Sequence, residues 1–442
     1  MTVTRPVEAE ERTQQRGVRL DGVTVFSVYV FVLLLIPSNL TISALGSLGV
    51  PGMLIGILAF AWWAWEQTNR LQPLPGGSTA VRKAALIFLV VLLMVYAHSA
   101  LLPLPEDERS VADSGMLRIL GMCGVILALN DGIDSRERLR VLLRRLGIAG
   151  AVMAVLAIVQ VVSGSLIVDS ITIPGLAPHD TATADVTLRE GRVRPTGTST
   201  NAIEFGAILA MFLPIAITSA RAARSRARAI WGWLAVGLIS LAALLAMSRT
   251  ALICAAVAVL VMLPVWPSRS RLLIMVTGVV GLLGASLVFP GLGGTLRGLF
   301  LGAAGDPSVQ SRTSGYGIAT EFILQNPILG RGFATFLPKY WILDNLYLQY
   351  TVDTGLLGLA ALVGILVSAM VCAYKATKRL SATVDREYSA ALLAAAAAGS
   401  VSLLFFDAFA FPQSAGIVCL VVGLCGATWR LTRAQTDLDA LP

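Results

Sequence analysis

The chain has 442 residues, of which 56% are hydrophobic and 14% are charged, and its formal net charge is +8. Soluble domains carry about 25% charged residues, so this composition excludes a soluble globular protein. Apolar runs approach the roughly 20 residues that cross a bilayer as a helix. Because backbone groups in lipid must be hydrogen-bonded within the segment, we predict an all-α polytopic membrane protein. A β-barrel would show short alternating segments instead.

Twelve membrane-spanning helices are predicted, without an appended soluble domain or an internal repeat. A polar stretch precedes the first apolar run and no small-residue cleavage site follows it, so we expect no cleavable signal peptide. The predicted organisation is a tail at 1–22, nine helices within 23–289, a large loop at 290–353, three helices within 354–429 and a tail at 430–442. The predicted spans are 23–37, 49–65, 84–102, 115–130, 146–164, 201–220, 230–247, 251–266, 272–289, 354–374, 388–409 and 414–429.

The distribution of basic residues predicts the orientation. If both termini are cytoplasmic, the cytoplasmic segments hold 24 of the 34 lysines and arginines. This asymmetry follows the positive-inside pattern of membrane proteins, so we expect a multi-pass protein of the bacterial inner membrane. The basic balance then reflects topology, and nucleic-acid binding is not implied.

Tryptophans and cysteines have simple interpretations. The tryptophans cluster at the predicted cytoplasmic boundary, where such residues anchor helices in the interface: Trp62, Trp63, Trp65, Trp231, Trp233, Trp266 and Trp429. The cysteines all fall in apolar runs without metal-ligand spacing, so we interpret them as packing residues: Cys123, Cys254, Cys372, Cys419 and Cys425.

Two predicted external loops are long, at 165–200 and 290–353. Loops of this length are usually functional or disordered. The second loop carries Ile318, Phe322 and Ile323 at helical spacing, so we expect it to fold over the membrane surface.

Four arginines lie near predicted external helix ends, against the positive-inside bias. They are Arg194 in RVRPTGTST, Arg249 in MSRTA, Arg312 in VQSRTSG and Arg331 in LGRGF. A guanidinium is always charged and binds phosphate oxygens with two parallel hydrogen bonds, so these residues suggest an anionic ligand. The alternative is a surface ion pair or a side chain that reaches from the helix to the interface.

Four acids and both histidines lie within or near the predicted spans or external loops. Glu204 lies about one turn inside the sixth predicted span, where an ionisable residue suggests a functional site or a structural partner for an arginine. Asp344, Asp353 and Asp407 lie near external ends of spans. Neither histidine has a partner at metal-ligand spacing, so we expect structural or solvated roles for both: His98 and His179.

Several stretches of the sequence resemble a known family. The stretch DNLYLQYTVDTGLLGL resembles the signature of O-antigen ligases and polysaccharide polymerases, a His and a small polar residue, nine positions, then Gly-x-x-Gly. Here Asn345 is the small polar residue, and Gly355 and Gly358 are the glycines. Upstream, NPILGRGFATF, RPTGTSTNAIEFG and MSRTA resemble three further stretches of the family, in the same order along nearly the whole chain.

The resemblance implies a glycosyltransferase of the C type that acts at the external face on glycans linked to polyprenyl pyrophosphate, such as undecaprenyl pyrophosphate. Transfer would need neither metal nor cofactor and would invert the anomeric carbon. Arg194 and Arg249 would stabilise charge on the pyrophosphate, and Asp344 would act as base. Substrate-binding roles would fall to Arg312, Arg331, Glu204, Asn345, Gly355 and Gly358.

One departure from the family pattern affects the choice between activities. This chain has Asp344 where the resembled ligases place His, which favours a polymerase of repeat units over a ligase that transfers glycan to a lipid or other cell-surface acceptor. Asp344 could instead cap the helix that follows. The expected partners are the lipid-linked donor, a glycan or lipid-glycan acceptor, membrane lipid and other polysaccharide-assembly proteins. A lipid-linked glycan flippase and a non-catalytic scaffold are the alternatives from other classes.

Overall fold

The computed structural model describes residues 21–166, 168, 171–178, 188–189, 192–289, 294 and 307–439. Each of the twelve predicted spans overlaps a helix. Among the described residues, eight helices are long and apolar enough to cross a membrane, and α1 and α8 are shorter apolar helices. The helices are α1 (Gly22–Leu35), α2 (Pro51–Asn69), α3 (Ala80–Ala100), α4 (Glu106–Gly132), α5 (Arg136–Ser163), α6 (Ala202–Arg221), α7 (Arg226–Leu245), α8 (Arg249–Met262), α9 (Ser268–Val288), α12 (Leu346–Arg379), α13 (Thr383–Ser402) and α14 (Pro412–Asp439). The prediction of an all-α fold typical of polytopic membrane proteins is confirmed.

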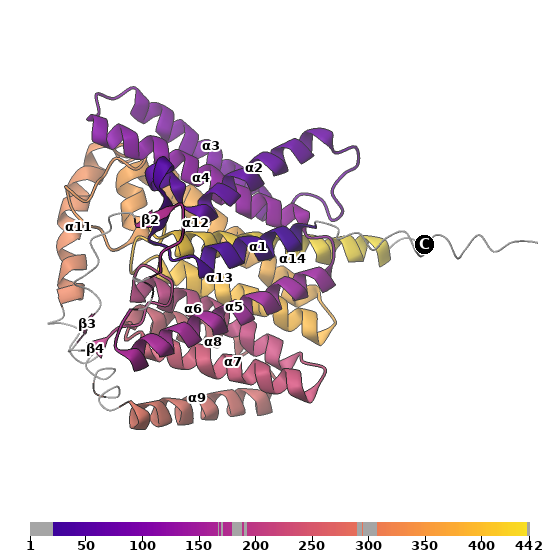
Figure 1. Cartoon of the computed structure of the whole chain (residues 1–442). Helices are drawn as coiled ribbons and strands as arrows, with labels where there is room; N and C mark the ends of the chain where they lie inside the picture. Colours follow the sequence, from indigo (N-terminus) through magenta and orange to yellow (C-terminus); the bar gives the residue numbers. More distant parts are fainter. Residues whose placement is uncertain are drawn as a thin grey trace, which may run out of the picture.

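Helices α6 and α14 lie at the centre of the bundle. The most apolar stretches of α6 and α14 are 89% and 94% buried, whereas that of α9 is 6% buried. Helix α6 packs against α7, α8 and α13, and α9 lies at the margin beside α7 (Figure 1). Small residues permit this close packing, since most of the alanines in 390–398 of α13 are buried.

Helix α11 (Pro307–Gln325) lies across the ends of the bundle helices, at the left of Figure 1. Its partly buried Ile318, Phe322 and Ile323 pack around Phe336 and Leu343, so the predicted helical spacing is confirmed. We call this end of the bundle the external end and the opposite end the cytoplasmic end, following the orientation predicted from the charges.

Short strands at the external end pair segments of the connecting loops. Strand β1 (Leu40–Ile42) precedes the 3-10 turn η2 (Ser43–Gly49) and pairs antiparallel with β2 (Leu176–Pro178). Strand β3 (Leu188–Arg189) pairs antiparallel with β4 (Arg192–Val193). The predicted loop 165–200 is therefore tied to the connection between α1 and α2.

Several helix bounds and tryptophan positions differ from the predicted ones. Helix α12 begins at Leu346 rather than at 354, and α13 ends at Ser402 rather than at 409. Trp63, Trp266 and Trp429 are buried within the bundle rather than placed as interfacial anchors, and the Trp63 indole donates a hydrogen bond to the Asp131 carboxylate (2.9 Å). The five cysteines are buried free thiols, as predicted.

Arginines at the cytoplasmic end pair with carboxylates of neighbouring helices. Arg140 binds Asp385 with two hydrogen bonds (2.6 and 2.9 Å), and Arg221 binds Glu387 in the same way (3.0 Å each). These pairs join α5 and α6 to α13. These arginines at the cytoplasmic end therefore stabilise the packing of the helices, besides contributing to the charge asymmetry that predicts the orientation of the protein in the membrane.

Candidate active site

Two of the arginines predicted to bind an anionic ligand lie at the turn between α7 and α8. Arg249 is the first residue of α8, and Ser248 is its N-cap. Arg194 is buried, and its Nε donates to the Ala246 carbonyl in the same turn (3.3 Å). Met247 has a φ of 47°, an uncommon backbone conformation for a non-glycine residue and one that clusters at functional sites. A buried, strained turn therefore brings Arg194 close to Arg249 at the external end.

The segment 196–204, which follows Arg194, is held by buried neutral side chains. The Gln160 Oε1 accepts from the Gly197 N–H (3.0 Å), and its Nε2 donates to the Gly197 carbonyl (2.9 Å). The Gln413 Oε1 accepts from the Ser199 hydroxyl (2.6 Å), and its Nε2 donates to the Thr198 hydroxyl (3.1 Å). Helices α5 and α14 thus fix the backbone beside Arg194.

Glu204 completes this segment. Its fully buried carboxylate accepts from the Thr200 N–H at the start of α6 and from the Ser414 N–H at the start of α14, both at 3.0 Å. Asn201 caps α6 by accepting from the Glu204 N–H (2.8 Å). Helix N-termini attract negative charge, so these contacts give Glu204 a structural role between two helices. The substrate-binding role suggested from the sequence stays a prediction.

Helix α12 is broken near its external end, and a neighbouring loop fills the break. Gly355 has a φ of 65°, which interrupts the helical hydrogen bonds. The Leu356 N–H then donates to the Pro327 carbonyl (2.8 Å), and the Asp353 carbonyl accepts from the Gly332 N–H (3.0 Å). The stretch NPILGRG therefore supplies the hydrogen bonds that the broken helix has lost.

The glycines of the family motif permit the close approach of these two segments. A Cβ at Gly355 would lie 2.2 Å from the Ile328 carbonyl oxygen, and a Cβ at Gly330 would lie 2.5 Å from the Asp353 carbonyl carbon. Both residues have positive φ, at 65° and 71°. Gly358 also packs tightly, since a Cβ there would meet the Thr354 hydroxyl at 1.9 Å. Steric need explains these glycines, and the substrate-binding role predicted for Gly355 and Gly358 is not tested by this geometry.

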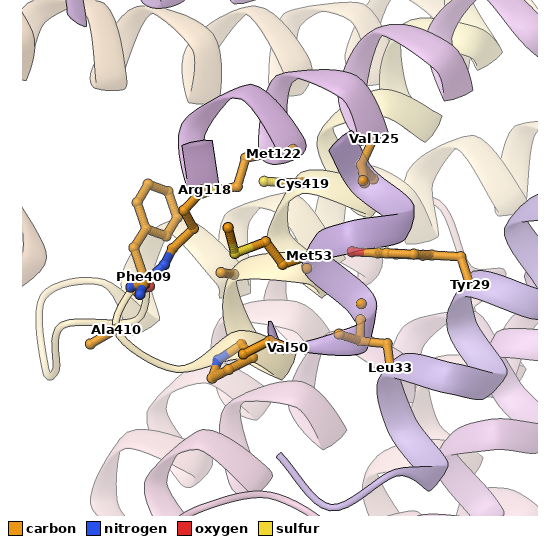
Figure 2. Close-up of a pocket in the computed structure, with 16 residues that line it drawn as sticks. Tyr29, Leu33, Val50, Met53, Arg118, Met122, Val125, Phe409, Ala410 and Cys419 are labelled. Carbon is orange, nitrogen blue, oxygen red and sulfur yellow. The ribbon is translucent and has the colours of Figure 1, made fainter. Parts of the chain in front are cut away.

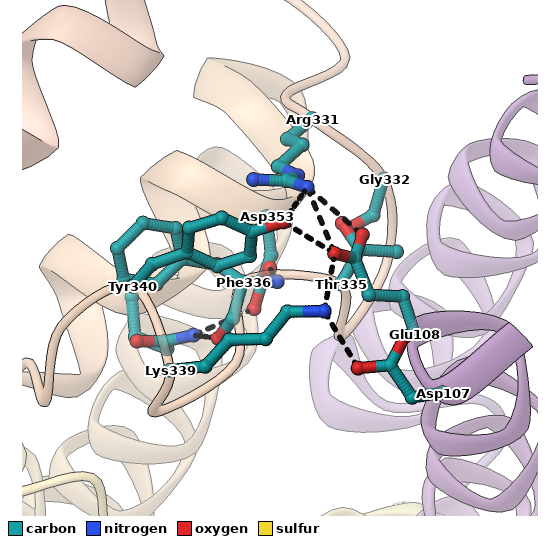
Figure 3. A network of polar contacts seen from close by, with 10 residues as sticks. Asp107, Glu108, Arg331, Gly332, Thr335, Phe336, Lys339, Tyr340 and Asp353 are labelled. Carbon is teal, nitrogen blue, oxygen red and sulfur yellow. Dashed lines mark hydrogen bonds and ion pairs between the residues drawn. The ribbon is translucent and has the colours of Figure 1, made fainter. Parts of the chain in front are cut away.

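Arg331 follows this joint and binds a buried carboxylate. Its guanidinium donates to both Glu108 oxygens (3.0 and 2.9 Å) and to the Tyr340 hydroxyl (2.7 Å), and it stacks on the Tyr340 ring with 4.1 Å to the centroid (Figure 3). Lys339 bridges Glu108 and Asp107 (3.1 and 2.6 Å). These hydrogen bonds raise the pKa of Lys339, which stays charged. The structure gives Arg331 a role in joining this loop to α4, and the sequence analysis had not identified Glu108.

Asp353 is held by neutral donors within the same region. Its buried carboxylate accepts from the Phe336 N–H (2.9 Å) and from the Gln349 side-chain amide (3.0 Å). Figure 3 shows Asp353 beside the Arg331 network. Asp353 therefore fixes the 330–340 loop against the external part of α12.

Asp344 and Asn345 begin α12. Asn345 is the N-cap, and its side chain accepts from the Leu348 N–H (3.2 Å). The interpretation of Asp344 as the helix cap is therefore wrong, because the neighbouring amide already fills that position. The Leu346 N–H donates to the Leu403 carbonyl (2.9 Å), which places Asp344 beside the loop between α13 and α14.

That loop carries Asp407, which lies close enough to Asp344 for its charge to matter. Burial raises the pKa of Asp407 to about 6, the Arg118 charge and backbone N–H groups oppose this shift, and the Asp344 charge adds to it. Arg118 of α4 also donates a long hydrogen bond to the Phe409 carbonyl (3.4 Å). Figure 2 shows Arg118 beside Phe409 at the edge of a groove. The sequence analysis missed Arg118, although its charge inside a predicted span was a visible signal.

Two predicted residues lie partly or wholly outside the described residues. The backbone of Arg312 belongs to α11, but its side chain is not among the described residues. His179 lies outside them as well. The predicted convergence of Arg312 with Arg194 and Arg249 therefore stays a prediction.

Comparison with known proteins supports the resemblance. Residues 234–363 match the family model described as O-antigen ligase. The match begins within α7, ends within α12 and includes Arg249, Arg331 and Asp344, whereas Arg118 and Arg194 lie outside it. No curated protein matches the chain. Residues 234–363 are therefore similar to the O-antigen ligase family, and the long apolar helices of the described residues indicate a multi-pass membrane protein.

Proposed function

We propose that this protein polymerises polysaccharide by joining lipid-linked repeat units at the external face of the membrane. The donor is a glycan on polyprenyl pyrophosphate, and the acceptor is a hydroxyl of a second lipid-linked glycan. The observation that carries this proposal is the family match over 234–363, together with Asp344 at the motif position where the resembled ligases have His.

The arrangement of residues suits this chemistry. A pyrophosphate is a competent leaving group, so the enzyme needs cations where negative charge grows and a base at the acceptor hydroxyl. Arg194 and Arg249 at the α7–α8 turn supply the cations. Asp344 supplies the base, and attack from the face opposite the pyrophosphate inverts the anomeric carbon. Two guanidinium groups provide the charge stabilisation in this scheme without a metal ion or a cofactor.

The proposal places these groups outside the cytoplasm, in a protein with both termini inside. Reporter fusions after Gly175 and Gly315 test the orientation. Periplasmic signals from both positions support it, and a cytoplasmic signal from either position contradicts it. The basic asymmetry of 24 among 34 residues is the physical reason for the expectation.

The activity is tested by extracting lipid-linked glycans from a strain that lacks this protein. A polymerase defect leaves single repeat units on the lipid carrier. The description of the matching family makes the ligase the second candidate, and a ligase defect would leave full-length chains on the carrier instead. A lipid-linked glycan flippase is the outcome if single units accumulate only in the cytoplasmic leaflet, and unchanged lipid-linked glycan contradicts all three functions.

A further inference from the structure

One face of α4 lines two cavities that follow each other along the helix. The external cavity has a volume of about 710 Å³ and is lined by Glu106, Arg109, Ser110 and Asp113, opposite η2. The second is a narrow groove between α1, α2, α4 and α14. Their α4 residues recur at spacings of three and four, so they form one stripe on the helix. The stripe from Glu106 to Val125 extends over about 28 Å at 1.5 Å per residue.

The stripe changes from polar to apolar along its length. The external turns carry carboxylates, serines and an exposed arginine, which are donors and acceptors suited to sugar hydroxyls. The deeper groove is lined mainly by apolar residues, among them Leu33, Met53, Met122 and Val125 (Figure 2). Its volume is about 50 Å³, and methionines change shape readily, so a thin hydrocarbon chain can enter by rotation of side chains.

Arg118 stands where the polar part of the stripe gives way to the apolar part. It is the only charged residue that lines the groove among the described residues, and it belongs to the wall together with Phe409. Asp407 lies near enough for each charge to act on the other, and the Asp344 charge also acts on Asp407. A cation at the boundary between a polar cavity and an apolar groove complements a phosphate between a glycan and a lipid tail.

From this succession we infer that the α4 stripe binds the lipid-linked saccharide that acts as acceptor. The sugar occupies the external cavity, the phosphate lies at Arg118 and the isoprenoid chain enters the groove beside Met53. This inference rests on the proposed function and assigns the second substrate its site. The acceptor is chosen because Arg118 lies on the side of Asp344, the proposed base, whereas the donor cations lie at the α7–α8 turn.

Photo-crosslinking in nanodiscs tests the inference with the full-length protein. The probe is an undecaprenyl-pyrophosphate disaccharide with a diazirine in its isoprenoid tail, and the readout is the set of labelled peptides. Wild type is expected to be labelled in α2 and α4. Arg118→Ala is expected to lower this labelling roughly tenfold or more, the effect of losing a charge-assisted contact to phosphate. Arg144→Ala, which removes an exposed arginine at the cytoplasmic end, is the matched control and should label as wild type does.

Met53→Trp supplies a test that leaves the charge unchanged. The larger side chain fills the groove, so it should lower labelling of α4 while Arg118 remains in place. If Arg118→Ala does not yield folded protein, Met53→Trp alone decides the result. Labelling confined to other helices, or unchanged labelling in the folded variants, overturns the inference. Equal competition by the same molar amount of phosphatidylglycerol also overturns it, because the groove then holds ordinary phospholipid.

The binding site on α4 and the polymerase activity are tested separately. Crosslinking reports binding without turnover, so an inactive variant still gives an answer. If the deletion strain accumulates single repeat units but the α4 stripe is not labelled, the polymerase stands and this site falls. If the stripe is labelled but lipid-linked glycans are unchanged in the deletion strain, the proposed function fails and the binding site stands.

Discussion

Two segments at the external end are fixed to the bundle by opposite physical means. The segment 196–204 is held by neutral groups, chiefly Gln160, Gln413 and backbone N–H groups that bind Glu204. The segment 326–340 is held by an ion pair between Arg331 and Glu108 in addition to neutral hydrogen bonds with α12. Arg194 lies just before the first segment and Arg331 lies within the second, and the sequence suggested both as ligands for phosphate.

The guanidinium groups of Arg331 and Arg194 have different surroundings. Arg331 already has a buried carboxylate, a phenol and an aromatic ring around its guanidinium, which is the arrangement of a structural ion pair. Arg194 reaches the α7–α8 turn, where its Nε meets a neutral carbonyl and Arg249 lies nearby. The contacts of Arg331 favour a structural role for it, and under the proposed function Arg194 and Arg249 bind the donor pyrophosphate.

The largest effect on activity is expected at Asp344, which follows the segment 326–340 in the sequence. If its carboxylate is the base, Asp344→Asn should lower chain extension by roughly 10²–10⁴-fold, because the amide cannot take a proton. The measurement is the rate of polymer formation from lipid-linked repeat units in nanodiscs.

Asn345 provides the control for this change. Asn345→Ser keeps an oxygen that caps α12 and should leave folding near wild type, whereas Asn345→Ala should cost about 1 kcal/mol. Full activity in Asp344→Asn at normal protein level would remove the carboxylate from the mechanism.

The second prediction sets the arginines of the two segments against each other. Arg194→Ala should lower activity by roughly 10²–10³-fold, the scale for losing one donor to a developing anion, at normal protein level. Lys should rescue poorly at this position, because an ammonium does not present a planar fork. Activity is measured together with thermal unfolding in detergent. Wild-type turnover in the Arg194→Ala variant would contradict its role with the pyrophosphate.

Arg331→Ala should act on folding, since it removes two hydrogen bonds to the buried Glu108 carboxylate and leaves Lys339 as its remaining cationic partner. The loss of unfolding free energy is expected to be roughly 1.5–3 kcal/mol, the scale for a hydrogen bond to a charged group, because Lys339 still pairs with Glu108. The double change Glu108→Gln with Arg331→Met should recover part of this loss, because it removes both charges. A stable but inactive Arg331→Ala protein would show that Arg331 contacts substrate after all.

The sequence predicted the helices better than the joints between them. Apolar runs located each span, because the hydrophobic match to the bilayer is a local property. The break at Gly355 was not foreseen, since it depends on hydrogen bonds from a loop more than twenty residues away. Glu108 was overlooked for the same reason, because only the fold brings it to Arg331. The family motif located Asp344 and Asn345, but the capping role belongs to Asn345.

The smallest effect is expected at Asp407, where the Arg118 charge and the backbone N–H groups of Phe409 and Ala410 only partly offset the effect of burial. Burial raises its pKa to about 6 from an ordinary value of 3.8. The folded state therefore holds this proton more tightly, so the unfolding free energy falls as pH rises from about 4 to about 6 and is constant above that.

Asp407→Asn removes the loss of stability that comes from ionising this carboxyl group. Because the side chain is partly exposed, we expect the variant to match wild type at pH 4 and to be more stable by about 1 kcal/mol at pH 7.5. Unfolding in detergent at the two pH values measures the difference, and an Asn variant that is less stable at pH 7.5 would show that the charged carboxylate supports the fold through Arg118.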